Sequence, residues 1–348
     1  MAAGRADGPI TPIGGFFELH RPGSDATGPS VLETWTGGRP FAAYANARSA
    51  FAALAALLPE ATIWLPAFLC VDLMGSAFRD RLRFYPVRDG FEPDLTVVEA
   101  EATTADLVLL VAQFGLPIGD SARDFARRRR DLWIVEDRAQ ALGPGLGPCA
   151  GYALYSPRKL LGVADGGILV APEGRAPLPQ PAAVADEDKL WRPALLRHAD
   201  PHGADNARWY AASRTKEAAM RAGPEAITAR SLSILSETPI AGLAAARWAN
   251  WRFLDARLRR WSALPPDPQA PPLGYVLRLA ARARDHLLAA LHAERIFAAV
   301  HWPTIAAAEA DFPREAGWTR ELVTLPCDHR YGEAEMVRIA ERVVEVLA

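Results

Sequence analysis

Short apolar runs alternate with segments of helical periodicity in the first half of the chain. Five runs predict strands, at residues 62–65, 82–86, 107–113, 132–135 and 167–171. Helical patterns cover residues 50–58, 71–78 and 120–130. Because the apolar runs lack polar alternation, we expect strands that are buried on both faces, as in a mostly parallel central sheet flanked by helices. The pattern therefore predicts an α/β fold.

The second half of the chain has a different pattern. Residues 188–260 are largely helical, and the proline-rich stretch SALPPDPQAPP that follows is the clearest break in the chain. Beyond the break, short strand patterns at 274–280 and 296–300 mix with helical patterns at 284–294 and 333–347. This mixture is typical of an α+β unit.

The length of the chain, 348 residues, is sufficient for a major and a minor domain. We expect a large α/β domain over residues 30–260 and a smaller α+β C-terminal domain over residues 261–348. Residues 1–29 are expected to pack on the smaller domain.

Composition argues against several classes of function. The net charge is −2, and the basic block at residues 127–130 lies on a predicted helix, whereas a nucleic-acid binder would carry a wider basic footprint. No run approaches the ~20 apolar residues of a membrane span, and the N-terminus has no apolar signal core. Cys70, Cys149 and Cys327 show neither a disulfide framework nor metal-ligand spacing. We expect a cytoplasmic protein with no metal and no nucleic-acid or membrane partner.

Lysine is scarce, which makes the position of each lysine informative. Of the 39 basic residues, only Lys159, Lys189 and Lys216 are lysines. Lys159 stands before a glycine pair, Gly166 and Gly167. Arginine stays protonated, whereas a desolvated lysine can lose its proton and form a Schiff base. We interpret Lys159 as a catalytic residue in preference to a surface lysine.

An acidic pair, Glu136 and Asp137, follows the apolar run at 132–135. Ligands of open α/β sheets bind at the carboxyl ends of the strands. A carboxylate there can hold a ring nitrogen protonated, as pyridoxal 5′-phosphate (PLP) requires for its electron sink. Residues 46–49 precede a predicted helix and are suited to hold a phosphate at its N-terminus. The alternative for Asp137 is a helix N-cap.

This order of parts resembles the DegT/DnrJ/EryC1/StrS family of sugar aminotransferases, which are PLP-dependent transferases of fold type I. The family's strand motif ending in ED-x-x-Q resembles residues 136–140, and its K-x6-GG motif resembles Lys159, Gly166 and Gly167. Weaker matches stand in the expected order at residues 47–51, 65–68, 113–115 and 325–331.

The resemblance implies roles for the motif residues. Lys159 would form the Schiff base and move the proton during catalysis. Asp137 would pair with the pyridine nitrogen of PLP, and Gln140 would contact the 3-oxygen side of the ring.

The resemblance also implies a phosphate site. Ser156 would bind the phosphate, although it stands three residues before Lys159 and the family's serine stands five before. The backbone of Ala47 and Arg48 would complete the site at the start of the first predicted helix.

Two departures from the family pattern concern the ring and the neighbouring subunit. Cys70 falls where the family often has an aromatic residue that stacks on the cofactor, so Phe68 or Phe114 would cover the ring. The family's asparagine-bearing segment, which reaches the neighbour's site, is not recognisable near residues 231–240. For that reason the assignment to PLP chemistry is firmer than the assignment to a nucleotide sugar.

The resulting prediction is a PLP-dependent aminotransferase with a ping-pong mechanism. A donor such as glutamate would supply the amino group, and a keto or aldehyde compound would accept it, with a nucleotide-linked keto-sugar favoured. Two alternatives stay open. The chain could be another PLP enzyme that acts on an amino acid or a natural-product intermediate, or a catalytically silent regulator of the same fold.

A homodimer is implied by the same resemblance. Trp191, Trp209, Trp248 and Trp251 stand among arginines in the helical stretch, a composition that is enriched at interfaces. The alternative is that these tryptophans pack the chain's own helices. His301, in the segment His301-Trp302-Pro303, likewise has two readings, as a residue at the substrate entrance or as part of a packed loop.

Overall fold

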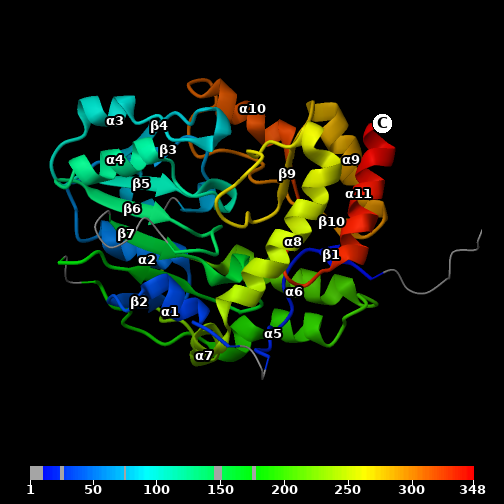
Figure 1. Cartoon of the computed structure of the whole chain (residues 1–348). Helices are drawn as coiled ribbons and strands as arrows, with labels where there is room; N and C mark the ends of the chain where they lie inside the picture. The colour runs from blue at the N-terminus through cyan, green and yellow to red at the C-terminus, as the bar shows by residue number, and fades with distance from the viewer. Residues whose placement is uncertain (1–10, 24–26, 74–75, 145–150, 175–177) are drawn as a thin grey trace, which may run out of the picture.

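A seven-stranded sheet forms the centre of the first half of the chain (Figure 1). The computed structural model describes residues 11–23, 27–73, 76–144, 151–174 and 178–348, so Cys149 lies outside the described residues. The strands lie in the order β2-β8-β7-β6-β5-β3-β4. They are β2 (Phe41–Tyr44), β3 (Ile63–Pro66), β4 (Leu82–Tyr85), β5 (Leu107–Val111), β6 (Trp133–Asp137), β7 (Tyr152–Tyr155) and β8 (Gly167–Val170). β8 runs antiparallel to its two neighbours and the other pairs are parallel, which confirms the mostly parallel sheet.

Helices cover both faces of this sheet. Alternate side chains of a strand point to opposite faces. One face packs on α2 (Ala47–Ala55), and the other packs on α3 (Thr96–Glu101) and α4 (Asp120–Arg128) and, towards β8, on α1 (Val31–Thr36). Four of the five residues of β5 are buried. Burial on two faces explains the continuous apolar runs in the sequence.

One expected helix is absent. Residues 71–78 were expected to form a helix, but the described residues form two short 3₁₀ turns, Val71–Leu73 and Ser76–Arg81. The apolar residues of this segment do not share a face, since Val71 is 42% exposed whereas Leu73 and Phe78 are buried. Without a common apolar face the segment gains little from a continuous helix.

The helical stretch contains α5 (Glu187–His198), α6 (Asn206–Ala219), α7 (Ala229–Glu237) and α8 (Ile240–Leu258). α5 and α6 pack against each other, and α8 runs from the sheet towards the C-terminal helices (Figure 1). The tryptophans of this stretch are mostly internal. Trp191, Trp209 and Trp251 are 1%, 4% and 3% exposed, and Trp248 is half-buried. Trp191, Trp209 and Trp251 pack the chain's own core, so the prediction that they form an interface is wrong; for Trp248 it stays a prediction.

The C-terminal part has its own apolar core. β9 (Tyr275–Arg278) pairs antiparallel with β11 (Leu322–Leu325), and β1 (Ile13–Gly14) pairs parallel with β10 (Ile296–Phe297). The helices of this part are α9 (Ala281–Ala293), α10 (Pro313–Glu321) and α11 (Glu333–Leu347). α8 contributes Leu243 to the core beside the sheet and Leu254 to the C-terminal core. The domain boundary at residue 260 stays a prediction.

An aromatic cluster joins the two cores. Phe68 follows β3 and Phe114 follows β5, and both are fully buried. The Phe68 ring lies 5.1 Å from the ring of Trp302 and 5.1 Å from that of Trp318, both from the C-terminal part. The cluster therefore fixes the C-terminal part against the carboxyl ends of the sheet strands. No helix among the described residues is long and apolar enough to cross a membrane.

Candidate active site

Asp137 is the last residue of β6 and lies at the carboxyl end of the strand. Its side chain is buried, and its Oδ1 accepts a hydrogen bond from the backbone N–H of Ala139 at 2.8 Å. Residues 138–144 contain no helix, so the interpretation of Asp137 as a helix N-cap is wrong. Burial raises the pKa of the Asp137 carboxyl, and the positive charge of Lys159 acts in the opposite direction.

Lys159 ends a 3₁₀ turn, Pro157–Lys159, that directly follows β7. β7 is the parallel neighbour of β6, and this pairing brings the ends of both strands together. Burial raises the pKa of Asp137 and of Cys70 and lowers that of His301; the positive charge of Lys159 is a smaller influence on all three, opposing burial at Asp137 and Cys70 and adding to it at His301. These groups come from distant parts of the sequence. The structure therefore gathers them around one amine.

Gln140 lies in the turn after Asp137 and is buried. Its Oε1 accepts a hydrogen bond from the backbone N–H of Phe114 at 2.7 Å. Its Nε2 is buried and has no hydrogen-bond partner among the described residues. A buried amide donor without a partner costs about 1–3 kcal/mol, so this nitrogen is a place where a ligand oxygen would be stabilised.

The first turn of α2 lies beside the glycine pair. Asn46 caps the helix, with its Oδ1 accepting from the backbone N–H of Ser49 at 3.0 Å. The backbone N–H of Gly166 donates to Ala45 at 2.8 Å. A Cβ at Gly167 would lie 2.2 Å from the backbone carbon of Asn46. Glycine at this position therefore allows the chain after Lys159 to return against the start of α2.

Ala47 and Arg48 are the first two residues of α2. The first N–H groups of a helix have no partner within the helix and attract anions. The side chain of Arg48 is held by the carbonyl of Met220 at 2.8 Å and by Asp72 at 3.5 Å. The backbone of this turn, rather than the Arg48 guanidinium, is thus the candidate anion site.

Ser156 is buried between β7 and the turn that carries Lys159, and its carbonyl accepts from the N–H of Lys159 at 3.1 Å. Cys70 is half-buried, and burial raises the pKa of its thiol. The rings of Phe68 and Phe114 lie 6.3 Å apart inside the aromatic cluster. These four residues all lie at the carboxyl ends of β3, β5 and β7.

The loop that carries Lys159 is held by residues for which the sequence suggested no role. The Asp165 carboxylate accepts from the N–H and the hydroxyl of Thr228, both at 2.7 Å, and from Ser231. Arg158 forms an ion pair with Glu217 at 2.5 Å. Asp165 directly precedes the glycine pair in the sequence, but its partners lie about 60 residues away.

His301 is a second site residue whose place the sequence did not settle. Its Nδ1 lies 3.0 Å from the hydroxyl of Thr324, and its ring lies 6.2 Å from that of Phe114. Burial, with a further contribution from the charge of Lys159, lowers the pKa of His301 to about 3. The imidazole is therefore neutral at physiological pH.

Arg330, by contrast, is fully engaged in the structure. Its guanidinium binds the Asp328 carboxylate through two hydrogen bonds, of 2.8 and 2.9 Å, and approaches Glu18 at 3.3 Å. It also lies over the ring of Phe17 at 4.0 Å. This arrangement ties residues near the N-terminus to the segment after β11, so we assign Arg330 a structural role.

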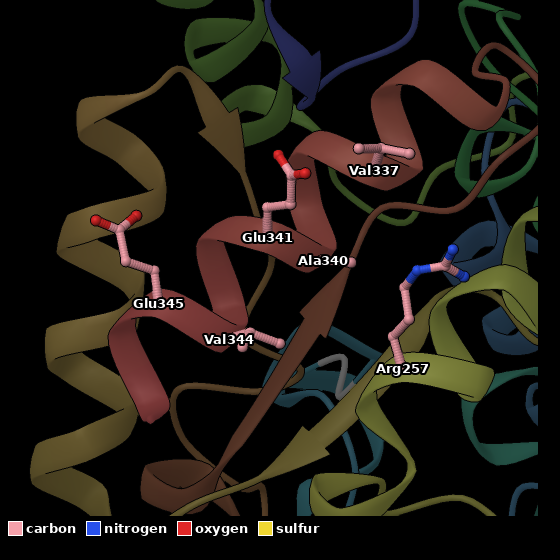
Figure 2. Close-up of a pocket in the computed structure, with 6 residues that line it drawn as sticks. All are labelled: Arg257, Val337, Ala340, Glu341, Val344 and Glu345. Atoms are coloured by element: carbon pink, nitrogen blue, oxygen red, sulfur yellow. The ribbon is translucent and has the colours of Figure 1, made fainter. Parts of the chain in front are cut away.

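A surface pocket lies between α8 and α11 (Figure 2). Its lining residues are Arg257, Val337, Ala340, Glu341, Val344 and Glu345. None of the predicted site residues lines it. Among the described residues, no group of three or more His, Cys, Asp or Glu side chains could hold a metal ion.

Comparisons with solved structures identify the fold. The chain is similar to Spr1654 from Streptococcus pneumoniae, which is described as a sugar aminotransferase and solved in PLP and PMP forms. The comparison with the PMP form gives a TM-score of 0.63 and 16% identity, and it covers 98% of this chain and 99% of that chain. A DegT DnrJ EryC1 StrS aminotransferase from Brucella abortus has a TM-score of 0.64 and 16% identity, with 90% and 87% covered. DesV from S. venezuelae, in complex with a ketimine intermediate, has a TM-score of 0.65 and 19% identity, with 92% and 91% covered.

No family model matches the chain, and no curated protein matches it in sequence. The structural similarity extends over nearly the whole chain, so the predicted aminotransferase fold is confirmed.

Proposed function

We propose that this chain is a PLP-dependent aminotransferase, which moves an amino group from a donor such as glutamate to a keto or aldehyde acceptor. The observation that carries the proposal is the meeting of Lys159 with the buried Asp137 at the ends of two adjacent parallel strands. A lysine and a strand-end carboxylate in this relation suit a cofactor that binds an amine covalently and carries a protonated ring nitrogen.

The residues present fit PLP. A ring oxygen would satisfy Gln140 Nε2, which lacks a partner among the described residues. A protonated ring nitrogen would supply a counter-charge for the buried Asp137 carboxylate. The first N–H groups of α2, at Ala47 and Arg48, and the hydroxyl of the buried Ser156 would hold the phosphate.

When bound, PLP supplies an electron sink and carries the amino group. Asp137 would keep the ring nitrogen protonated. Lys159 would hold the proton that moves to and from the substrate carbon, acting as general base and then as general acid. The buried Phe68 and Phe114 close the site from the side of the C-terminal part and exclude water there. Cys70 follows β3 at the same end of the sheet and would lie near the cofactor.

We further propose a nucleotide-linked keto-sugar as the favoured acceptor. Support comes from the similarity to Spr1654, which is described as a sugar aminotransferase. We also propose a homodimer in which a neighbouring chain completes each site. Because Trp191, Trp209 and Trp251 are internal, the interface of this dimer would be formed by other residues.

The scarcity of lysine makes a direct test possible. The purified protein is incubated with PLP, its absorbance is recorded, and borohydride is added before peptide mapping. We expect a yellow protein in which the cofactor is fixed to Lys159 and absent from Lys189 and Lys216. The Lys159→Arg variant should lose amino transfer at least a hundredfold, because guanidinium cannot form a Schiff base. Lys189→Arg, on an exposed part of α5, is the matched control.

The outcomes separate the open alternatives. A colourless protein that PLP cannot reconstitute would support a regulator and overturn the proposal. A yellow protein that converts no amino donor would point to another PLP-dependent reaction. Addition of glutamate to the yellow protein, followed by spectroscopy, distinguishes this result from amino transfer.

A further inference from the structure

His301 brings a nitrogen-bearing ring from the C-terminal part to the candidate site, where it packs against Phe114. The residue follows β10 in the C-terminal part, whereas Lys159 follows β7 of the large sheet. The ring of His301 contacts that of Phe114, whose backbone N–H donates to Oε1 of Gln140, a candidate cofactor-binding residue. His301 is therefore the contribution of the C-terminal part to a site built mainly on strand ends.

The orientation of the imidazole is fixed. Its Nδ1 lies 3.0 Å from Oγ1 of Thr324, a residue of β11 that is only 5% exposed. Its ring packs edge-on against that of Phe114 at 6.2 Å, with an interplanar angle of 74°. Nδ1 and the ring are thus in contact with protein groups, and Nε2 is the nitrogen available to a ligand.

Nε2 of His301 is the ring nitrogen without a protein partner among the described residues. The His301 side chain is only half-buried, so a ligand can reach this nitrogen. The Thr324 hydroxyl can donate or accept, so Nε2 can act as a donor or as an acceptor. Because the ring is neutral, it offers a single hydrogen bond and no positive charge.

We propose that His301 is a specificity-determining residue, whose Nε2 hydrogen-bonds an uncharged hydroxyl or carbonyl oxygen of the acceptor beside the carbon that receives the amino group. This inference rests on the proposed function and deepens it. A carboxylate, as in an amino acid donor, is bound best by a cation. A neutral imidazole selects a hydroxylated carbonyl compound instead.

The experiment compares two small acceptors that differ in one group. Hydroxyacetone carries a hydroxyl beside the carbonyl carbon, and butanone carries a methyl group in its place. Protein that has first been converted with glutamate is mixed with each compound, and return of the PLP absorbance gives the two rates. We expect the wild-type protein to prefer hydroxyacetone about tenfold, the effect of one hydrogen bond. His301→Phe keeps a ring against Phe114 and should bring the ratio close to one.

Two further variants guard against a packing effect. His301→Gln can place a nitrogen or oxygen near the position of Nε2 and should restore most of the preference. His286→Phe, on an exposed part of α9, should keep the wild-type ratio. If His301→Phe does not fold, Thr324→Val serves in its place, since it releases Nδ1 and should lower the preference.

A second measurement is independent of turnover. The ¹⁵N signal of the His301 side chain in cofactor-free protein should shift at Nε2 on titration with hydroxyacetone and stay in place with butanone. A wild-type ratio near one, or a ratio that His301→Phe leaves unchanged, overturns the inference. If the wild-type protein is never converted by an amino donor, the proposed function fails instead, so the two failures are distinguishable.

Discussion

At the scale of the residue, the candidate site combines groups that are costly to bury. Asp137 is a carboxyl whose pKa is raised by burial, and Gln140 has an amide nitrogen without a partner among the described residues. Each lowers the stability of the cofactor-free protein. Such costs are expected where a ligand supplies the missing partner.

Asp137→Asn tests this reasoning. The amide cannot hold a ring nitrogen protonated, so we expect amino transfer to slow by a factor on the order of 10²–10³. Because a folded carboxyl with a raised pKa loses stability when it ionises above its unfolded pKa, removing it should raise the melting temperature of the cofactor-free protein at pH 7. Activity and thermal unfolding are measured on the same preparations. A variant that melts lower without cofactor and retains its rate would assign Asp137 to local structure.

The sequence predicted the site residues that stand directly after a strand, because their place follows from the position of that strand in the sheet. Lys159 and Asp137 follow adjacent strands, so the end of the sheet brings them together. His301 meets Phe114 only because the C-terminal part packs across the strand ends, and no local pattern carries that information. The same limit applies to Asp165, whose partners Thr228 and Ser231 come from the start of α7.

At the scale of the element, the position of the first turn of α2 depends on the close approach of Gly166 and Gly167. β8 begins at Gly167, directly against the N-cap of α2, and its neighbour Gly166 bridges to Asn46. The element that would bind phosphate is thus positioned by the segment that follows Lys159. The spacing between Lys159 and the glycines, which the sequence displayed, has a steric reason in the structure.

Gly167→Ala should disturb this junction. Its Cβ would lie 2.2–2.4 Å from backbone atoms of Asn46 and Ala47, which cannot move aside as a flexible side chain could. We expect a loss of roughly 1–3 kcal/mol in the free energy of unfolding, and weaker binding of PLP. Gly242→Ala in α8 is the control, since no atom lies within 4 Å of its added Cβ. Denaturant unfolding and PLP titration check both variants. Equal stability of Gly167→Ala and wild type would contradict the steric explanation.

α6 brings a second lysine close to the loop that carries the catalytic one. Lys216 Nζ donates to the carbonyl of Ala164 at 3.0 Å. Burial, and to a lesser extent the charge of Arg158, lowers the pKa of Lys216 from 10.5 to about 8. Between these two pH values the unfolded chain binds a proton that the folded chain has released. The stability of the folded state therefore rises with pH in this window.

Lys216→Met should remove this pH dependence. Relative to the variant, the wild-type protein should gain stability as pH rises from about 8 to about 10.5, with a slope of at most about 1.4 kcal/mol per pH unit. Lys189→Met controls for the loss of one positive charge at an exposed position. Denaturant unfolding at several pH values measures the difference. A constant difference between wild type and Lys216→Met across this range would show that the amine is not desolvated.

At the scale of the whole molecule, the fold consists of two apolar cores joined at a few places. The sequence predicted the strands and the mostly parallel sheet, because burial on two faces leaves a continuous apolar pattern. It did not predict how the C-terminal part closes over the strand ends. The aromatic cluster around Phe68 makes that closure, and the ion pair of Arg330 with Glu18 ties the segment after β11 to residues near the N-terminus. Both join residues more than 200 positions apart.

Partly buried histidines lie at both junctions and make them sensitive to acid. His301 adjoins Phe114, and His329 lies 5.9 Å from Phe17, with its Nδ1 buried and without a partner among the described residues. Burial lowers the pKa of each imidazole to about 3, from 6.5 in the unfolded chain. Burial by itself would raise the pKa of Asp328, but its ion pair with Arg330 lowers that pKa, so acid also weakens this pair.

The free energy of unfolding should therefore fall as pH drops below about 6.5. In that range the two histidines bind protons in the unfolded chain but stay neutral in the folded chain. Each imidazole contributes a slope of at most about 1.4 kcal/mol per pH unit. His329→Phe keeps an aromatic ring beside Phe17 and removes one titration. The variant should lose less stability than the wild-type protein between pH 6.5 and pH 4, whereas His286→Phe, at an exposed position of α9, should follow the wild type. Denaturant unfolding at half-unit pH steps measures this, and parallel curves for His329→Phe and wild type would rule out His329 as a source of the acid sensitivity.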